Sequence, residues 1–354
     1  RYFMTRHDIP IIDLTPYFEG GQDSKQKVAS DMNRACEDIG FFIITGHGVD
    51  PELCRKVNAV SREFFDLPVK EKLIIRQTSD EANRGYEALG TEVLSATIGK
   101  MTPPDLKESF SLGPINVPDD PYYHRGSAAP HYAKNMWPER PVDFRKIIED
   151  YANVMEKLAR DLHRLAAIAF NLPEDFFEPK LDKPFYILRA LNYPNQLDNP
   201  ETEQLRAGEH SDYDNLTICL IEDRPGGLQA RNLEGIWIDV PGVRDAFVVN
   251  IGDLMMRWTN DRWKSTRHRV VNPPQDLASD SRRISMCFFA EPNHDAVIEC
   301  LPTCHGTGEP IKYLPITAGD YMIKKFARQA QGKEWSEADR MRFDTSDTET
   351  RFIK

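Results

Sequence analysis

Short runs of β-forming residues dominate the chain after Pro184, and they restrict its fold more than any other feature. The runs are rich in β-branched and aromatic residues, and Gly, Pro, Asn and Asp separate them. They cover residues 186–193, 216–221, 227–230, 236–240, 246–250, 268–271, 284–289 and 296–299. Strands of this length and spacing are typical of a β-sandwich or jelly roll. We therefore expect a mainly β core with flanking helices.

Helical patterns lie on both sides of this β region. Apolar residues at helical spacing predict helices at 24–39, 51–65, 142–171 and 318–331. Strand-like runs occupy residues 9–14 and 41–44. Between residues 84 and 140, Gly and Pro are frequent and only residues 106–112 alternate like a strand. We expect the loops of this stretch, with residues 318–354, to shape a pocket.

These patterns divide the chain into four parts of one domain. Residues 4–140 form an N-terminal region of helices and strands, and residues 141–183 form a long helix and a connector. Residues 184–300 form the β core. Residues 301–354 form a C-terminal helix and a polar tail, which we expect to be loosely attached.

Composition excludes several kinds of partner. The net charge of −11 has no basic stripe, which argues against nucleic acid. No apolar run approaches the roughly 18 residues of a membrane span, so we expect a cytoplasmic protein with no membrane partner. The six cysteines are too scattered for a disulfide framework, and most are expected to be small buried apolar residues. The oligomeric state is left open.

Three residues form a candidate metal site. His210 and Asp212 are two positions apart in a strand-like run, so their side chains can share a face, and His268 follows later in the chain. Two imidazoles and one carboxylate, with half of the coordination sphere open, are the ligand set of non-haem Fe(II) sites. In a chain with nine histidines, this triplet alone is a weak signal.

A second group of residues predicts an anion site. Arg283 and Ser285 are two apart on a predicted strand, so the guanidinium and the hydroxyl share a face. A buried Arg requires an anion, and a carboxylate accepts two hydrogen bonds from it. Tyr193, at the end of another strand, could donate to the same anion. The alternative for Arg283 is a structural salt bridge.

Many motifs in order carry a resemblance that covers nearly the whole chain. They are residues 11–14, 40–49 and 64–68 in the first half, and 192–194, 208–212, 226–229, 250–253, 260, 264–265, 268–270 and 283–285 in the second. With these motifs the chain resembles the Fe(II)/2-oxoglutarate-dependent dioxygenases of the isopenicillin N synthase-like family. Residues 81–86, 105–109, 206–210 and 257–261 are most similar to fungal members of the thymine-hydroxylase type.

The resemblance implies a fold, an activity and roles for residues. The fold would be a distorted double-stranded β-helix, that is, a jelly roll of the cupin type. His210, Asp212 and His268 would bind Fe(II), and Arg283, Ser285 and Tyr193 would hold the distal carboxylate of 2-oxoglutarate. With O2, such an enzyme hydroxylates, desaturates or ring-closes a small molecule, in specialised or nucleobase metabolism, and releases succinate and CO2.

Strand periodicity suggests further residues for the substrate pocket. Arg189 and Leu191 fall on the same face as Tyr193, so we expect Arg189 to contact a polar or anionic part of the substrate. Tyr213 and Phe289 are aromatic candidates for the pocket wall. The alternatives are a rim arginine paired with an acid, and ordinary core aromatics. Asn250, Asp253 and Asn260 are expected in turns or in support of the metal ligands.

Two other functions remain open. The first is an Fe(II) oxidase that uses no 2-oxoglutarate and takes all electrons from its substrate, whose carboxylate Arg283 and Ser285 would then bind. The second is a non-catalytic protein that binds small molecules on the same fold. Retention of all three candidate metal ligands argues against the second.

Overall fold

The computed structural model describes residues 8–77 and 82–331, and an eight-stranded sheet lies at its centre. The strands of this major sheet follow the order β1-β2-β10-β7-β12-β5-β4-β3. All neighbouring pairs are antiparallel except β1 and β2. The strands are β1 (Ile11–Asp13), β2 (Phe41–Thr45), β3 (Gly85–Glu87), β4 (Glu108–Leu112), β5 (Ile187–Tyr193), β7 (Leu216–Ile221), β10 (Phe247–Ile251) and β12 (Arg283–Ala290).

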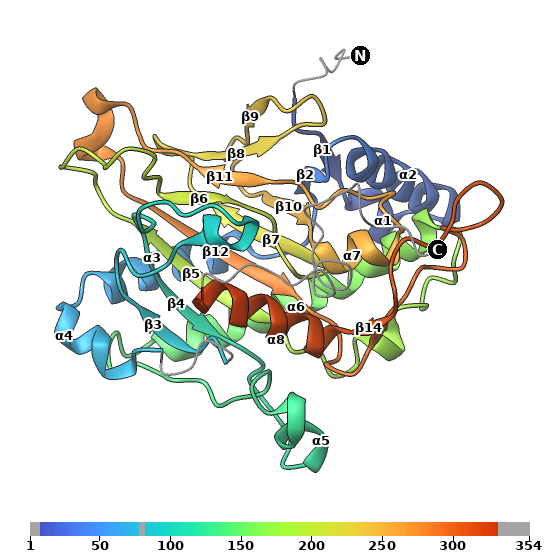
Figure 1. The fold of residues 1–354 in the computed structure, drawn as a ribbon, viewed down its shortest axis with the longest axis horizontal. Helices are drawn as coiled ribbons and strands as arrows, with labels where there is room; N and C mark the ends of the chain where they lie inside the picture. The colour runs from blue at the N-terminus through green and yellow to red at the C-terminus, as the bar shows by residue number, and fades with distance from the viewer. Residues whose placement is uncertain (1–7, 78–81, 332–354) are drawn as a thin grey trace.

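A second, four-stranded sheet accompanies the major one. Its order is β6-β11-β8-β9, and its strands are β6 (Ala207–His210), β8 (Leu228–Arg231), β9 (Trp237–Asp239) and β11 (His268–Val270). In Figure 1 these strands occupy the upper part of the view, with β12, β5, β4 and β3 below them. A small sheet pairs β13 (Val297–Ile298) with β14 (Ile316–Thr317). The expected mainly β core with flanking helices is confirmed.

Helices cover one face of the major sheet. The longest, α6 (Phe144–Ala169), packs against α2 (Gln22–Asp38) and α3 (Pro51–Phe65) and contacts β7 and β12. The other α-helices are α1 (Thr15–Glu19), α4 (Val69–Lys72), α5 (Pro121–His124), α7 (Asp253–Trp258) and α8 (Ala318–Gln331). Short 3-10 helices are η1 (Leu73–Ile75), η2 (Leu94–Ile98), η3 (Gly126–Ala128), η4 (Glu178–Lys180) and η5 (Gln275–Asp280).

Local sequence explains where these helices begin and end. The Asp50 side chain accepts a hydrogen bond from the Glu52 amide and caps α3, and Pro51 occupies its first turn. After α2, Gly40 has a φ of +71°. A Cβ at this position would lie 2.1 Å from the carbonyl oxygen of Lys264, so only glycine fits between α2 and the chain that packs on it.

The alternation of side chains along the central strands creates two apolar clusters. On β12, Ile284, Met286 and Phe288 belong to the large cluster shared with the helices. The side chain of Cys287 points to the opposite face of β12. It belongs to a smaller cluster with residues of the second sheet such as Ala230 and Val270. Each central strand is therefore buried on both faces, one against helices and one toward the second sheet.

Some elements were not expected from the sequence. They include α1, α4, α5, α7, β3 and β14, which are all short. The sequence of β6, Ala-Gly-Glu-His, contains no strong β former, and its strand conformation depends on pairing with β11. The cysteine expectation was wrong for Cys219 and Cys287, which face each other on β7 and β12 and form a disulfide. The expected loose tail lies outside the described residues, as does the start of the N-terminal part.

No helix in residues 8–77 and 82–331 combines the length and the apolar character needed to cross a bilayer.

Phe64 anchors the contact between α3 and the major sheet. Its ring is fully buried and lies 5.0 to 5.4 Å from the rings of Phe65, Phe110 and Phe144. We predict that Phe64→Ala lowers the free energy of unfolding by about 3–5 kcal/mol, because the cavity cannot collapse among rigid rings. Urea denaturation measures the change. Ile74→Ala, at a side chain that is 78% exposed, serves as the control and should change it by less than about 0.5 kcal/mol.

Candidate active site

The three candidate metal ligands come together between the two sheets. His210 ends β6 and His268 begins β11, and the two residues are directly paired across the strands. Asp212 follows β6 by two residues, in a loop rather than in the expected strand. One ligand atom from each of the three side chains lies within 4.8 Å of the others. Among the described residues, this is the one His/Cys/Asp/Glu cluster with such geometry.

Hydrogen bonds orient both imidazoles toward Asp212. Nδ1 of His210 lies 2.7 Å from the carbonyl oxygen of Gly208, and Nδ1 of His268 lies 3.0 Å from that of Thr266. Because a carbonyl only accepts, each Nδ1 carries a proton, which leaves Nε2 as the atom that can bind a metal. The two Nε2 atoms lie 3.7 and 3.5 Å from Oδ1 of Asp212. Two imidazole nitrogens and a carboxylate at this spacing fit a divalent iron ion.

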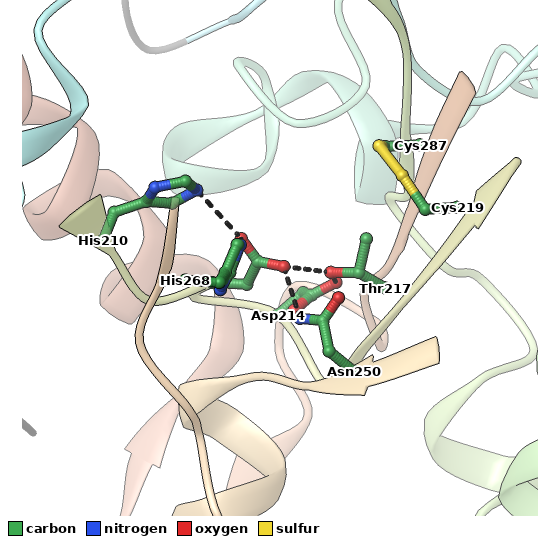
Figure 2. The surroundings of a disulfide bond; sticks show 8 residues. His210, Asp214, Thr217, Cys219, Asn250, His268 and Cys287 are labelled. Atoms are coloured by element: carbon green, nitrogen blue, oxygen red, sulfur yellow. Dashed lines mark hydrogen bonds and ion pairs between the residues drawn. A yellow bond between two sulfur atoms is a disulfide. The ribbon is translucent and has the colours of Figure 1, made fainter. Parts of the chain in front are cut away.

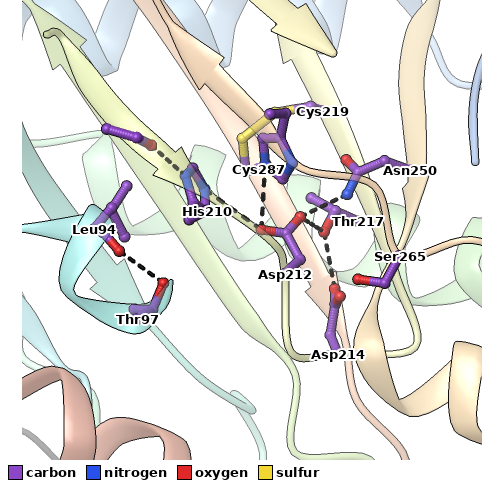
Figure 3. A network of polar contacts seen from close by, with 12 residues as sticks. Leu94, Thr97, His210, Asp212, Asp214, Thr217, Cys219, Asn250, Ser265 and Cys287 are labelled. Carbon is purple, nitrogen blue, oxygen red and sulfur yellow. Dashed lines mark hydrogen bonds and ion pairs between the residues drawn. A yellow bond between two sulfur atoms is a disulfide. The ribbon is translucent and has the colours of Figure 1, made fainter. Parts of the chain in front are cut away.

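The second oxygen of Asp212 is held by two side chains (Figure 3). Thr217 donates from Oγ1 to Oδ2 over 2.5 Å, and Asn250 donates from Nδ2 over 2.7 Å. Burial alone would raise the pKa of Asp212, but His268, His210 and the Thr217 hydroxyl outweigh it and hold the pKa below its usual range. Asp212 is therefore an anion with one oxygen fixed and the other directed at the histidines. The expectation that Asn250 supports the metal ligands agrees with this contact.

The triad opens into a large cavity of about 1040 Å³, including its mouth. Odd-numbered residues of β12 and β5 line it, as their strand periodicity predicts. They are Arg283, Ser285, Cys287 and Phe289 on β12, and Ile187, Arg189, Leu191 and Tyr193 on β5. Tyr213 also lines the cavity. All ten residues that the sequence predicted for metal, 2-oxoglutarate or substrate thus border one space.

Arg283 has the properties expected of an anion-binding group. Its side chain is buried, and NH1 donates to the carbonyl oxygen of Gly226 over 3.2 Å. In the described part of the chain, its Nε has no hydrogen-bond partner. The guanidinium lies 5.6 Å from the ring centre of Tyr193, which is paired with Arg283 across β5 and β12. A carboxylate in the cavity would satisfy this cation, so the site fits 2-oxoglutarate.

Arg189 also borders the cavity, but acidic and polar side chains occupy its guanidinium. NH1 lies 3.1 Å from Oε1 of Glu92, NH2 donates to Asn83 over 2.8 Å, and Nε donates to Ser111. Lys107 contacts the same Glu92 carboxylate. The charge of Arg189 is therefore already neutralised, and a substrate here meets a polar wall rather than an unpaired cation.

The C-terminal helix α8 supports the loop that carries Asp212. The Asp212 carbonyl accepts a hydrogen bond from the amide of Asp253. The Asp253 carboxylate in turn accepts hydrogen bonds from Tyr321 and Lys325 of α8, each over 3.0 Å. Met322 of the same helix lines the cavity. Asp253 thus supports the site as expected, whereas Asn260 binds the backbone of residues 304–312 and only shapes a turn.

The Cys219–Cys287 disulfide borders the same cavity (Figure 2). It joins the neighbouring strands β7 and β12 close to Thr217 and the metal ligands. The other four cysteines are free thiols. Strand periodicity carried a signal for this pair, because Cys287 follows Ser285 on the cavity face. Nothing in the sequence indicated that Cys219 would lie opposite.

Several polar residues of the cavity were not predicted from the sequence. Glu92, Lys107, Asp214, Thr217 and Glu291 all line it. Glu291 was open to prediction, because it continues the odd-numbered face of β12 beyond Phe289. No periodicity in the sequence places Glu92 at the cavity, because this residue lies between short elements in the stretch expected to be loops.

Comparison with known proteins identifies the family. A family model described as the non-haem dioxygenase N-terminal region in morphine synthesis matches residues 9–140, and the 2OG-Fe(II) oxygenase superfamily matches residues 184–292. A 2-oxoglutarate-Fe(II) type oxidoreductase, hxnY of Emericella nidulans, is 37% identical over 92% of this chain and 90% of its own. The chain is a member of the 2OG-Fe(II) oxygenase superfamily. This oxygenase is therefore an enzyme that uses Fe(II), 2-oxoglutarate and O2.

Other relatives of the oxygenase act on different small molecules. Homoarginine-6-hydroxylase 2-ODD-233 of Oryza sativa is 33% identical over 90% of this chain and 96% of its own. A crystal structure of Neurospora crassa T7H with alpha-KG and thymine superposes with a TM-score of 0.77, at 32% identity, over 90% of this chain and 96% of that one. These neighbours confirm the double-stranded β-helix fold and the resemblance to fungal thymine-hydroxylase-type enzymes.

The hydrogen bond from Asn250 to Asp212 offers a test of the metal site in this oxygenase. We predict that Asn250→Ala weakens Fe(II) affinity about 10- to 100-fold, the usual effect of removing a group that orients a metal ligand. Anaerobic titration of the metal-free protein with Fe(II) measures the affinity. The control is Asn199→Ala, at an exposed residue away from the triad, which should leave it unchanged. Equal affinities for both variants would contradict the role of Asn250.

Proposed function

We propose that this oxygenase binds Fe(II) through His210, Asp212 and His268 and 2-oxoglutarate through Arg283, Ser285 and Tyr193. The observation that carries the proposal is a buried arginine with no anionic partner among the described residues, in the same cavity as a His-Asp-His cluster. Residues 184–300 form the catalytic core in this proposal. Residues 83–107 and helix α8 complete the walls of the cavity.

The protein supplies geometry and exclusion of water. When bound, iron and 2-oxoglutarate would activate O2 for attack on a substrate C–H bond. Gly208 and Thr266 fix the rings of His210 and His268, so both Nε2 atoms are directed at one point before a metal arrives. Arg283, at the start of β12, holds the distal carboxylate of 2-oxoglutarate. Its position therefore sets the direction from which 2-oxoglutarate reaches the metal. The apolar walls at Leu191 and Phe289 keep water from the reacting groups.

The substrate in our proposal is a small, nitrogen-containing polar molecule. Relatives include a homoarginine hydroxylase, and a neighbouring structure contains thymine. Tyr213 and Phe289 provide aromatic surface on the wall of the cavity. Arg189, held in place by Glu92 and Asn83, offers a fixed polar contact rather than an unpaired charge. Hydroxylation of such a molecule is the outcome that we propose.

The two alternatives from sequence lose their support with the family assignment. Membership of the superfamily favours 2-oxoglutarate as co-substrate over an oxidase that takes all electrons from its substrate. The same membership favours an enzyme over a non-catalytic binding protein.

Product stoichiometry tests the proposed reaction. Enzyme loaded with Fe(II) and 2-oxoglutarate is mixed in air with members of a panel of pyrimidines and basic amino acids, including thymine and homoarginine. We predict that at least one compound accelerates 2-oxoglutarate consumption and is oxidised in a one-to-one ratio to succinate. Chromatography and mass spectrometry measure both products. Oxidation of a compound without succinate release would overturn the proposal.

Arg283 provides a matched pair of variants with its neighbour Arg282. Arg282 points to the opposite face and binds Asp66 and Asn192. We predict that Arg283→Gln weakens 2-oxoglutarate binding at least about 30-fold, because losing one partner of a buried charge pair costs about 2 kcal/mol or more. Arg282→Gln should leave the affinity within about twofold of the original. Calorimetric titration under anaerobic conditions measures both, and equal losses would contradict the assignment.

A further inference from the structure

Glu291 lies at the end of the cavity opposite Arg283. It follows β12 on the same odd-numbered face as Arg283, Ser285 and Phe289, and it lines the same cavity. An eight-residue separation along an extended strand corresponds to roughly 26 Å. Glu291 therefore stands well away from the group that we assign to the carboxylate of 2-oxoglutarate.

Asp214 joins Glu291 at this end. It precedes β7, whose first residue, Leu216, pairs with Ala290 of β12. The amide of Asn215 donates to the Ala290 carbonyl over 3.1 Å, which brings the two chain segments together. Asp214 also lines the cavity and is buried. Two carboxylates thus border the cavity near the metal ligands.

Neither oxygen of Glu291 has a hydrogen-bond partner in the part of the chain that the structure describes, although the residue is only 1% exposed. Oδ2 of Asp214 lies 3.0 Å from Oγ1 of Thr217, whose one hydroxyl proton is directed at Asp212, and Oδ1 of Asp214 has no partner among the described residues. Other buried acids differ from these two. Glu108 binds Lys72, Tyr86 and Asn192, and Glu92 binds Lys107 and Arg189.

An unpaired buried carboxylate is unfavourable, since it loses hydration without receiving a compensating charge or hydrogen bond. Burial, followed by the charge of Asp212, raises the pKa of Glu291 well above its usual range. Proteins retain such groups where a ligand completes them. Glu291 also borders a smaller cavity of about 250 Å³ beside Glu156 and Arg160. Only the main cavity contains the metal ligands as well, so a substrate would reach Glu291 from there.

The remaining charges on the cavity wall leave one kind of partner for Glu291. Lys107 and Arg189 neutralise Glu92. In the proposed function, the metal ion neutralises Asp212, and the distal carboxylate of 2-oxoglutarate neutralises Arg283. Among the described residues and the cofactors, no cation is assigned to Glu291 and Asp214. A positive group on the substrate would supply the charge that favours the ionised form of Glu291.

We propose that Glu291, assisted by Asp214, binds a protonated nitrogen group of the substrate, an ammonium or a guanidinium. This inference rests on the proposed function and narrows its substrate class to cationic compounds. Glu291 is then a residue that determines specificity: it fixes one end of the substrate while the metal and 2-oxoglutarate occupy their own positions. A neutral analogue of the same shape would leave the carboxylate unpaired and bind weakly.

Matched pairs of probes test the proposal. The protein is loaded anaerobically with Fe(II) and 2-oxoglutarate, and binding is measured calorimetrically for L-arginine against L-citrulline and for L-lysine against L-norleucine. Within each pair the molecules have similar length, and only one carries the side-chain cation. We expect at least one cationic probe to bind at least about tenfold more tightly than its neutral partner, a difference of about 1.4 kcal/mol.

Variants assign this preference to its residue. Glu291→Gln should reduce the cation preference to less than about twofold while 2-oxoglutarate affinity stays unchanged. The control, Glu149→Gln, removes a carboxylate of α6 that is paired with Arg145 and lines neither the main cavity nor the smaller one beside Glu291, and it should keep the preference. Thermal melting of the ligand-free protein checks the fold. Glu291→Gln should melt at the same or a higher temperature, because an unpaired carboxylate stabilises nothing.

Several results would overturn the inference. They are tighter or equal binding of the neutral probes, failure of every cationic probe to bind, an unchanged preference in Glu291→Gln, or a lower melting temperature of that variant. Failure of the proposed function itself has a different signature. In that case 2-oxoglutarate would not bind, or succinate would not accompany substrate oxidation, whatever the charge of the probe.

Discussion

The alternation of side chains along β12 is the constraint on which the rest of the structure depends. Even-numbered residues pack against α3 and α6, and odd-numbered residues face the cavity. A shift of the strand by one residue would place Arg283 among the helices and Met286 beside the substrate. Pairing with β5 on one side and β7 on the other prevents this shift, because both neighbours hold the strand in one register.

This register explains why the sequence predicted so much of the site. Side chains alternate between the two faces of any strand, so the face of each residue follows from the local sequence. This alternation assigns Arg283, Ser285 and Phe289 to one face of β12. It assigns Arg189, Leu191 and Tyr193 to one face of β5. The His-x-Asp pair came from the same reasoning, although Asp212 lies just beyond its strand. The loop still delivers the carboxylate to both histidines, since Thr217 and Asn250 hold it.

Tertiary contacts account for what the sequence could not predict. Arg189 and Arg283 look alike in sequence, each on the cavity face of a strand, yet Glu92 neutralises only the first. That difference depends on Glu92, which lies nearly a hundred positions before Arg189 in the chain. Its segment runs between short elements and shows no helix or strand periodicity. The pairing of Cys219 with Cys287 and the pairing of β6 with β11 likewise require knowledge of which strands become neighbours.

The contact between α8 and Asp253 has a consequence for how the protein is made. Asp253 holds the carbonyl of Asp212, and its own buried carboxylate depends on Tyr321 and Lys325. While a ribosome is still translating the chain, residues 318–325 are the last of this group to appear. Until they dock, Asp253 lacks its cation and the loop of Asp212 lacks its support. The support of the Asp212 loop is therefore complete only after α8 has been synthesised and has docked.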